Sequence, residues 1–333
     1  MWRKTMSKFV YIAVAAGLVL GILAGCGTSS AGNAPVSRSA LLLDTVVTVT
    51  LYGGEEALIE ECFHKCREYE LIFSRTHPDS ELYALNATGS MEVSEDLLRV
   101  IRAALEYCRV SNGAFDITMG GVSELYAFSS DDPRVPEGGE LAEAVSHVGY
   151  ENVLVEGNRV TLRDPEAVLD LGAIAKGYIA DRLAEFLREQ GVESALIDLG
   201  GNILCVGSKP GGSAYRVGLQ YPFRERKETI AVVEVRDLSV VTSGVYERSF
   251  EEGGVLYHHI LDPDTGLPVK SDLLAVSILS PRSVDGDALS TVCFALGLEK
   301  GLELINSLEG VYAAFVTEDM QLHYSAGFED FIR

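Results

Sequence analysis

Short β-branched segments follow one another between Ala195 and Leu279, separated by turn-forming residues, and they constrain the fold more than any other feature. Such segments are typical of β-strands. The helical patterns lie before and after this series, so regular βαβ alternation is absent. We therefore expect an α+β fold with largely antiparallel sheets. The expected strands are Ala195–Leu199, Ile203–Val206, Tyr215–Leu219, Ile230–Val235, Ser239–Val241, Val255–Leu261 and Leu274–Leu279.

Apolar residues recur at helical spacing in the flanking segments. A strand is expected at Leu41–Tyr52, a loop at residues 74–82 and a hairpin at residues 151–162. We expect one compact unit over residues 41–333, with packed helices and two lobes around a cleft. The expected helices are Glu55–Phe73, Ser94–Cys108, Ala173–Gln190 and Val284–Gly297, and the expected final strands are Val311–Val316 and Gln321–Tyr324.

The first residues predict export. A basic start and an almost wholly apolar run, Phe9–Ala24, precede small residues and Cys26, which indicates a secretory signal over residues 1–25. The run is short for a membrane span, which needs about 20 apolar residues. "LAGCG" resembles a lipobox, whose cysteine is lipidated, and residues 26–40 favour a flexible polar tether. We expect a lipid anchor at the outer face of the cytoplasmic membrane; a plain membrane anchor or an ordinarily cleaved signal is the alternative.

Charge and cysteines exclude several classes of protein. The net charge of −22 argues against binding to nucleic acid and to anionic lipid surfaces, although a metal could still attract a phosphate-bearing ligand. The five cysteines after Cys26 have irregular spacing and predict no disulfide framework. Cys62 and Cys66 favour buried, apolar positions over a zinc site, because no second Cys or His pair accompanies them.

Two polar islands contain glycines that let a backbone approach a ligand. In "GAFDITMGG" (113–121), Phe115 offers a stacking face and Asp116 offers oxygens, but a strand with glycine ends would give the same pattern. In "DLGAIAKGYIADRL" (170–183), Asp170 precedes a helix that favours anions at its N-terminus. Lys176 lies between small residues that leave room for a ligand; alternatively, Asp170 is only a cap and Lys176 only a solvated residue.

Two further islands carry oxygen and nitrogen ligands. Asp287 and Thr291 are four residues apart on an expected helix and share a face, which suits Mg²⁺. Plain helix-end charges and a half-buried threonine would give the same spacing. In "HHILDPDTG" (258–266), the second half favours a tight turn. His258 and His259 point to opposite faces of a strand, so at most one enters a given cleft, and we expect the other to face solvent.

These islands, in this order, resemble the ApbE family, the FAD:protein FMN transferases. The resemblance runs from about Leu41 to the C-terminus and rests on the order of the motifs. They are "PDSELYALN" (78–86), "GAFD" (113–116), "DLGAIAKGY" (170–178), "DLGGNI" (198–203), "VTSGVYERSF" (241–250), "HILDPDTGLPV" (259–269) and "DALST" (287–291).

The resemblance implies binding of FAD and Mg²⁺ and transfer of FMN to a threonine of a target protein, with release of AMP. It implies acceptor subunits in membrane redox complexes, of the NADH:quinone reductase or Rnf type. Asp287 and Thr291 would hold the metal with the carbonyl of Ala173, and His259 would act in the transfer together with Asp287. The implied FAD-binding residues are Leu43, Thr76, Ala114, Phe115, Asp116, Asp170, Lys176, Ile260 and Leu261.

Two departures from the family pattern stand out. Leu43-Asp44-Thr45 replaces a frequent Met-Gly-Thr, and Thr76 replaces an aromatic residue that can stack on the isoalloxazine. His77 or Phe73 could take its place. Two other functions are consistent with the residues: an FAD pyrophosphatase that releases FMN and AMP, and a lipid-anchored flavin-binding protein without catalysis.

Overall fold

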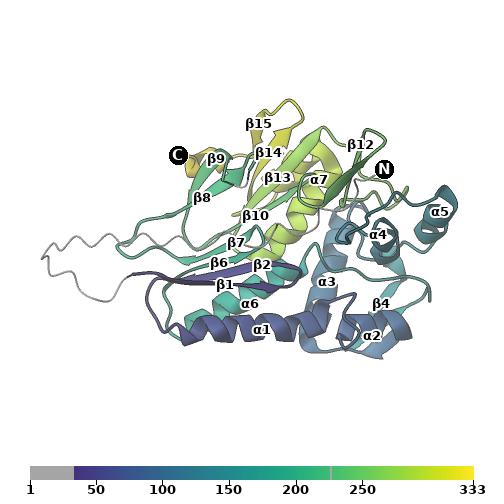
Figure 1. Ribbon diagram of the computed structural model, residues 1–333, viewed down its shortest axis with the longest axis horizontal. Helices are drawn as coiled ribbons and strands as arrows, with labels where there is room; N and C mark the ends of the chain where they lie inside the picture. Colours follow the sequence, from purple (N-terminus) through teal and green to yellow (C-terminus); the bar gives the residue numbers. More distant parts are fainter. Residues whose placement is uncertain (1–33, 226) are drawn as a thin grey trace, which may run out of the picture. The chain divides into compact units, whose positions relative to one another are not determined.

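An eight-stranded sheet organises the chain, in a computed structural model that describes residues 34–225 and 227–333 (Figure 1). The strand order is β1-β2-β6-β7-β10-β13-β14-β15, and each neighbouring pair is antiparallel, as predicted. The strands are β1 (Val36–Leu42), β2 (Thr45–Leu51), β6 (Ser194–Leu199), β7 (Asn202–Gly207), β10 (Ser239–Gly244), β13 (Leu273–Ser280), β14 (Tyr312–Thr317) and β15 (Leu322–Tyr324).

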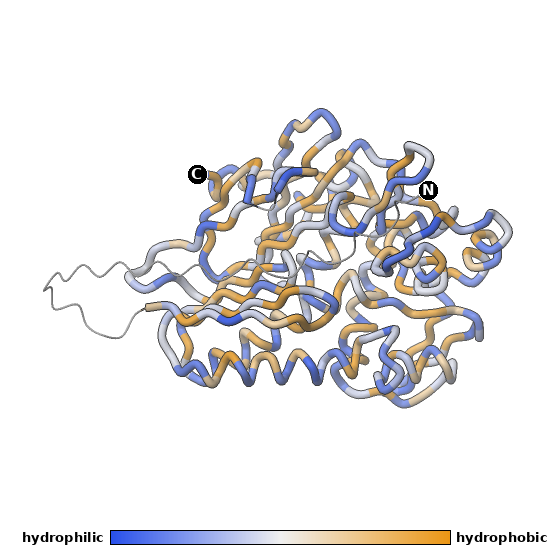
Figure 2. The backbone as a smooth tube through the Cα atoms, in the orientation of Figure 1, coloured by the Kyte–Doolittle hydropathy of each residue, from blue (hydrophilic) through white to orange (hydrophobic). Residues whose placement is uncertain are grey.

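Both faces of this sheet are covered. Three helices, α1 (Ala57–Phe73), α6 (Ala175–Glu189) and α7 (Ser283–Asn306), pack on one face. The hairpin of β8 (Tyr215–Gln220) and β9 (Thr229–Val235) packs on the other with the short helix η2 (Phe328–Phe331). Figure 2 shows hydrophobic residues along the central strands and alternating with hydrophilic residues along α1. Burial on two faces explains why β13 and β14 are apolar along most of their length.

The remaining elements form a second group beside the sheet. The small sheet β3-β5-β4 packs with helices between α1 and α6 in the sequence. The hairpin β11–β12 is joined to the C-terminal end of α4 by ring contacts of Tyr126 with Tyr257 and of Phe128 with Phe250. These elements are α2 (Glu81–Thr88), β3 (Ser90–Glu92), α3 (Glu95–Val110), α4 (Gly120–Tyr126), α5 (Gly138–Ser146), η1 (Tyr150–Asn152), β4 (Val153–Glu156), β5 (Arg159–Leu162), β11 (Ser249–Glu252) and β12 (Val255–His258).

The N-terminal boundary differs from the prediction. Strand β1 begins at Val36, so the last residues of the expected tether belong to the sheet. The expected single strand at 41–52 is a hairpin, because Leu43 and Asp44 both have positive φ, as a tight two-residue turn requires. Neither is glycine, which hid the turn from the sequence. The predicted signal and Cys26 lie outside the described residues.

Other local predictions fared better. The first three expected helices and the late strands are present within a few residues. Helix α7 continues past the expected end at Gly297 to Asn306, with a non-helical Gly297 inside it. The loop at 74–82 ends early because Ser80 caps α2. Helices α2, α4 and α5 and strands β3 and β11 were missed. Cys62 and Cys66 are buried free thiols, as predicted, and burial raises both of their pKa values to about 12. Among the described residues, no helix is long and apolar enough to cross a bilayer.

One edge of the large sheet gathers the predicted motifs. Because neighbouring strands are antiparallel, the β1–β2 turn, the Gly200-Gly201 turn, the end of β10 and the start of β13 share this edge. Gly200 has a φ of 68°, and a Cβ there would lie 2.0 Å from the Thr45 hydroxyl oxygen. Glycine is therefore required where the two turns meet.

Candidate functional site

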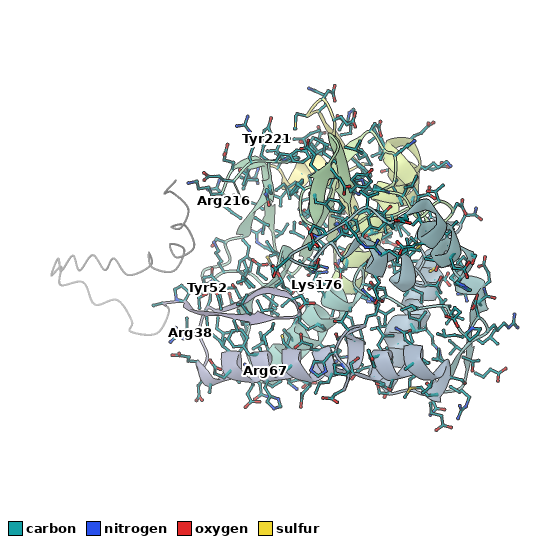
Figure 3. The ribbon with its side chains drawn as sticks, turned by 45° about the vertical axis from the view of Figure 1, so that its right-hand side comes forward. Arg38, Tyr52, Arg67, Lys176, Arg216 and Tyr221 are labelled. Atoms are coloured by element: carbon teal, nitrogen blue, oxygen red, sulfur yellow. The ribbon has the colours of Figure 1, made fainter. Side chains whose placement is uncertain are left out.

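Helices α6 and α7 cross so closely that only glycine fits at the contact. A Cβ on Gly177 would lie 2.3 Å from the carbonyl oxygen of Ser283. The crossing brings the first turn of α6 against the acidic part of α7. Asp287 and Lys176, distant in the sequence, become neighbours there (Figure 3 labels Lys176).

Asp287 is buried, with 4% of its surface exposed. Its Oδ2 accepts a hydrogen bond of 2.9 Å from the backbone N–H of Gly177, in the first turn of α6 where such groups lack intrahelical partners. Its Oδ1 faces the ammonium of Lys176 at 3.8 Å. That distance exceeds a hydrogen bond, so this carboxylate oxygen keeps coordination capacity for a cation.

Thr291 follows one helical turn after Asp287 and is half-buried. Its hydroxyl lies 3.3 Å from the hydroxyl oxygen of Ser243, at the end of β10. Ser243 also pairs with Ser290 at 2.7 Å, and Ser290 donates to the Asp287 carbonyl. Ser243 was missed as a site residue; its signal was the "TSG" at a strand end.

His259 directly follows β12, and its backbone N–H donates to the carbonyl of Arg248 at 3.1 Å. The residue is half-buried, and its Nδ1 is buried without a hydrogen-bond partner among the described residues. Burial lowers the pKa of His259 to about 3, and the positive charges of Arg248 and Lys176 act in the same direction. The imidazole is thus neutral at neutral pH, well away from the ordinary histidine pKa of about 6.5.

His258, the last residue of β12, does not face solvent. It is 6% exposed and meets the ring of Phe294 edge-on, with 5.7 Å between centroids. Burial lowers its pKa to about 4. The prediction of a solvent-facing histidine was wrong because the opposite face of this strand packs on α7.

The side chains of Phe115 and Asp116 in the "GAFD" motif contact other parts of the protein. Phe115 is 5% exposed and lies in the core, so its ring offers no stacking face. The Asp116 carboxylate accepts from the backbone N–H groups of Thr118 and Tyr150, at 2.7 and 2.9 Å. Burial raises the pKa of Asp116. Ala114 is half-buried and lines a cavity of about 700 Å³ together with Asp262.

Asp170 does not cap α6, whose N-cap residue is Ile174. It caps the preceding turn instead, accepting from the Gly172 N–H at 2.8 Å, and it pairs with Arg75 at 3.3 Å. Arg75 was not foreseen, because nothing in its loop marks the distant partner. Ala173 is half-buried in this turn, at the start of α6.

Of the two substitutes considered for an aromatic residue at Thr76, Phe73 is enclosed by other side chains. Thr76 is exposed, whereas Phe73 is 7% exposed and packs against Tyr69 and Tyr178. Phe73 is therefore not available as the substitute considered above. The backbone N–H of Asp79 donates to the His77 ring at 3.2 Å.

The other predicted FAD-binding residues offer backbone rather than side chains. Ile260 and Leu261 are 4% and 8% exposed and belong to two hydrophobic clusters, and Leu43 is half-buried in the β1–β2 turn. The following turn is tight, as predicted: Asp262 Oδ1 accepts from two N–H groups of the turn, and Gly266 has a φ of 68°.

The comparisons with known proteins agree with this geometry. A sequence model of the ApbE family matches residues 43–316. The chain belongs to the ApbE family. Among curated ApbE relatives, an FAD:protein FMN transferase of Treponema pallidum is 40% identical, covering 95% of this chain and 94% of its own length. One of Klebsiella pneumoniae is 35% identical, covering 88% and 93%.

Solved ApbE structures share the fold. The flavin transferase ApbE of Vibrio cholerae superposes with a TM-score of 0.80 at 26% identity, covering 90% of this chain and 99% of its own. The ApbE protein of Thermotoga maritima gives 0.82 at 31% identity, with 90% and 100% covered. The predicted family, fold class and enzyme class are thus confirmed.

Proposed function

We propose that this chain transfers FMN from FAD to a threonine hydroxyl of an acceptor protein and releases AMP. The observation that carries the proposal is the row Asp287–Lys176–His259. A buried carboxylate with one oxygen free for a cation lies next to a lysine whose charge reaches a neutral imidazole. The names of the curated relatives support the same donor and the same class of acceptor.

The reaction is a displacement at the phosphorus of the FMN half. The bond from the threonine oxygen to phosphorus forms, and the bond from phosphorus to the bridging diphosphate oxygen breaks. AMP leaves with that electron pair, and the threonine proton goes to His259. Positioning and charge neutralisation supply most of the catalysis in such reactions.

His259 suits the role of base because it is neutral at neutral pH. A threonine hydroxyl is a weak nucleophile, and a positioned base contributes about 10²–10⁴-fold. The low pKa makes the imidazole a weaker base, so its contribution is positioning and acceptance of the proton at the moment of bond formation.

The oxygen donors present fit Mg²⁺. Asp287, Thr291 and the carbonyl of Ala173 offer one carboxylate and two neutral oxygens, and Mg²⁺ prefers few protein oxygens with water and phosphate completing its shell. No group of three or more His, Cys, Asp or Glu within metal-binding reach occurs among the described residues, and this donor set does not need one. When bound, the ion would neutralise charge on the diphosphate.

The acceptor and the cellular location follow from the family resemblance and the N-terminal sequence. The acceptors we propose are flavin-carrying subunits of membrane redox complexes, of the NADH:quinone reductase or Rnf type. Lipidation of Cys26 would keep the enzyme at the outer face of the cytoplasmic membrane, within reach of those subunits. The net charge of −22 supports the absence of nucleic-acid partners.

FAD hydrolysis is the second candidate, favoured by the exposed Thr76 and the buried Phe73 in the loop where a flavin clamp was expected. A less tightly held flavin would give water access to the same phosphorus. The products would be free FMN and AMP.

One experiment separates these functions. The protein is incubated with FAD, Mg²⁺ and a candidate subunit bearing an Asp-Gly-x-Thr site, and the subunit is weighed by mass spectrometry. We expect each transfer to add the mass of one FMN less one water to the subunit and to release one AMP. Free FMN without labelled subunit would show a pyrophosphatase, and intact FAD would show a binder without catalysis.

A further inference from the structure

Arg248 is the cross-strand neighbour of His259. The register of β11 and β12 pairs Ser249 with His258, and the His259 N–H then donates to the Arg248 carbonyl at 3.1 Å. Arg248 and His259 thus form the next opposed pair of this ladder. Side chains of such a pair share a face and lie about 5 Å apart at Cβ. That face is the one opposite to the buried His258.

The guanidinium of Arg248 forms no ion pair among the described residues, and it differs from the other arginines without one in that its charge reaches His259. Arg248 is exposed, so its side chain is open to a ligand. Lys176, the other cation whose charge reaches His259, is already opposite Asp287. The arginines that do form ion pairs are Arg38, Arg75, Arg99, Arg109, Arg134, Arg159, Arg182, Arg188, Arg216, Arg282 and Arg333.

The segment that precedes Arg248 is held by backbone and ring contacts. The Val245 N–H donates to the Leu274 carbonyl at 3.0 Å, and a Cβ on Gly244 would lie 2.6 Å from the Tyr246 ring. The ring of Phe223 packs edge-on against Tyr246, with centroids 6.0 Å apart. The backbone of Arg248 therefore follows an ordered segment, so less conformational entropy is lost when its side chain binds a ligand.

We propose that Arg248 binds an oxyanion of the reacting complex beside His259. The inference rests on the proposed FMN transfer and adds a substrate-binding residue to it. A guanidinium binds phosphate and carboxylate oxygens through paired N–H groups. Two sources of such oxygens meet at this point: the phosphoryl group under attack, and a carboxylate of the acceptor next to its threonine.

The test uses Arg248→Gln and Arg248→Lys, with Arg67→Gln as the matched control, since Arg67 is an exposed arginine of α1 that lies away from the site (Figure 3). Two constants are measured: Kd for FAD by flavin fluorescence without acceptor, and KM for the acceptor in the transfer assay. Loss of a charge-assisted contact should raise one of them about 10–100-fold in Arg248→Gln. Arg248→Lys should recover only part of it, because lysine cannot bind in a bidentate manner.

The pattern identifies the source of the oxyanion. A raised Kd for FAD identifies the phosphoryl group. An unchanged Kd with a raised KM identifies the acceptor carboxylate, and an Asp→Asn acceptor should then impair the wild type but not Arg248→Gln. Both constants within about two-fold of Arg67→Gln would overturn the proposal. Failure of the wild type to label any acceptor would instead count against the proposed function, while the FAD arm would still decide whether Arg248 binds the phosphoryl group.

Discussion

Asp181 and Asp287 are placed alike and used differently. Each lies on one of the two crossing helices and accepts backbone N–H groups from the first turn of the other. Asp181, on α6, accepts from Ser283 and Val284 at 2.7 and 3.0 Å, one N–H for each of its oxygens. Asp287, on α7, accepts only from Gly177 and keeps Oδ1 open.

The comparison shows that a buried carboxylate can bind a cation only if the backbone N–H groups around it leave one of its oxygens free. With both oxygens bonded, Asp181 fastens the start of α7, although burial raises its pKa to about 6. With one oxygen open next to Lys176, Asp287 has capacity for a cation. Both aspartates thus bond to the first turn of a neighbouring helix. Asp181 only stabilises the crossing, whereas Asp287 also offers a candidate metal site.

The largest effect should come from Asp287→Asn. The amide keeps the shape but removes the negative charge, and a bound metal contributes several kcal/mol, so transfer should fall by about 10³-fold or more. Mass-spectrometric counting of FMN on the acceptor measures this. Asp181→Asn is the control, with transfer expected to stay within about five-fold of wild type. Equal losses in both variants would contradict the distinction.

His259→Ala tests whether His259 accepts the proton of the attacking threonine. Transfer should slow by about 10²–10⁴-fold while Kd for FAD changes little, because the imidazole acts on the acceptor proton. His258→Phe, in the core, is the comparison and should retain transfer. Transfer by His259→Ala at the wild-type rate would show that His259 has no role in catalysis.

Asp181 should leave a signature in the pH dependence of stability. Its pKa is about 6 in the folded chain and 3.8 as the reference value, so the folded state holds the proton more tightly. Its contribution is fully present below about pH 4 and is lost as pH rises through 6. From pH 5 to pH 7, wild type should therefore lose about 1 kcal/mol of unfolding free energy relative to Asp181→Asn. Urea unfolding of both proteins measures it, and a pH-independent difference would contradict the raised pKa.

The smallest effect concerns the pH profile of the wild type. A base must be deprotonated to act, and the low pKa of His259 places its loss of activity near pH 3. We expect kcat/KM for the acceptor to show no inflection near pH 6.5, since this parameter reports the free enzyme. A fall in kcat/KM towards acid pH with a midpoint near 6.5 would contradict the low pKa. It would mean that water reaches the imidazole of His259 in solution.

Local patterns predicted most of the helices and strands. Apolar periodicity placed α1, α3 and α6, and turn chemistry placed the hairpin β4–β5 and the turn after His259. The turn at Leu43-Asp44 escaped because its positive φ values are carried by residues other than glycine. Tertiary packing can hold residues other than glycine at positive φ, and the sequence then contains no sign of the turn.

The site was only half visible in the sequence. Motif order named Asp287, Thr291 and His259. The sequence gave no local sign that Arg75 pairs with Asp170. It also gave none that Arg248 lies beside His259. Phe115 was read as a stacking face and is part of the core. Exposure of an aromatic ring depends on what packs against it, and periodicity over a few residues carries no information about that.

By itself, the sequence determined the kinds of elements, their order and the family, because these depend on spacing within short stretches and on motifs in register. The tertiary structure alone decided which carboxylate has a free oxygen, which histidine is enclosed by the core and which arginine lies beside His259. Those properties arise where α6 crosses α7 and where β11 pairs with β12. The groups that meet there are far apart along the chain, and their protonation and binding capacity depend on that shared environment.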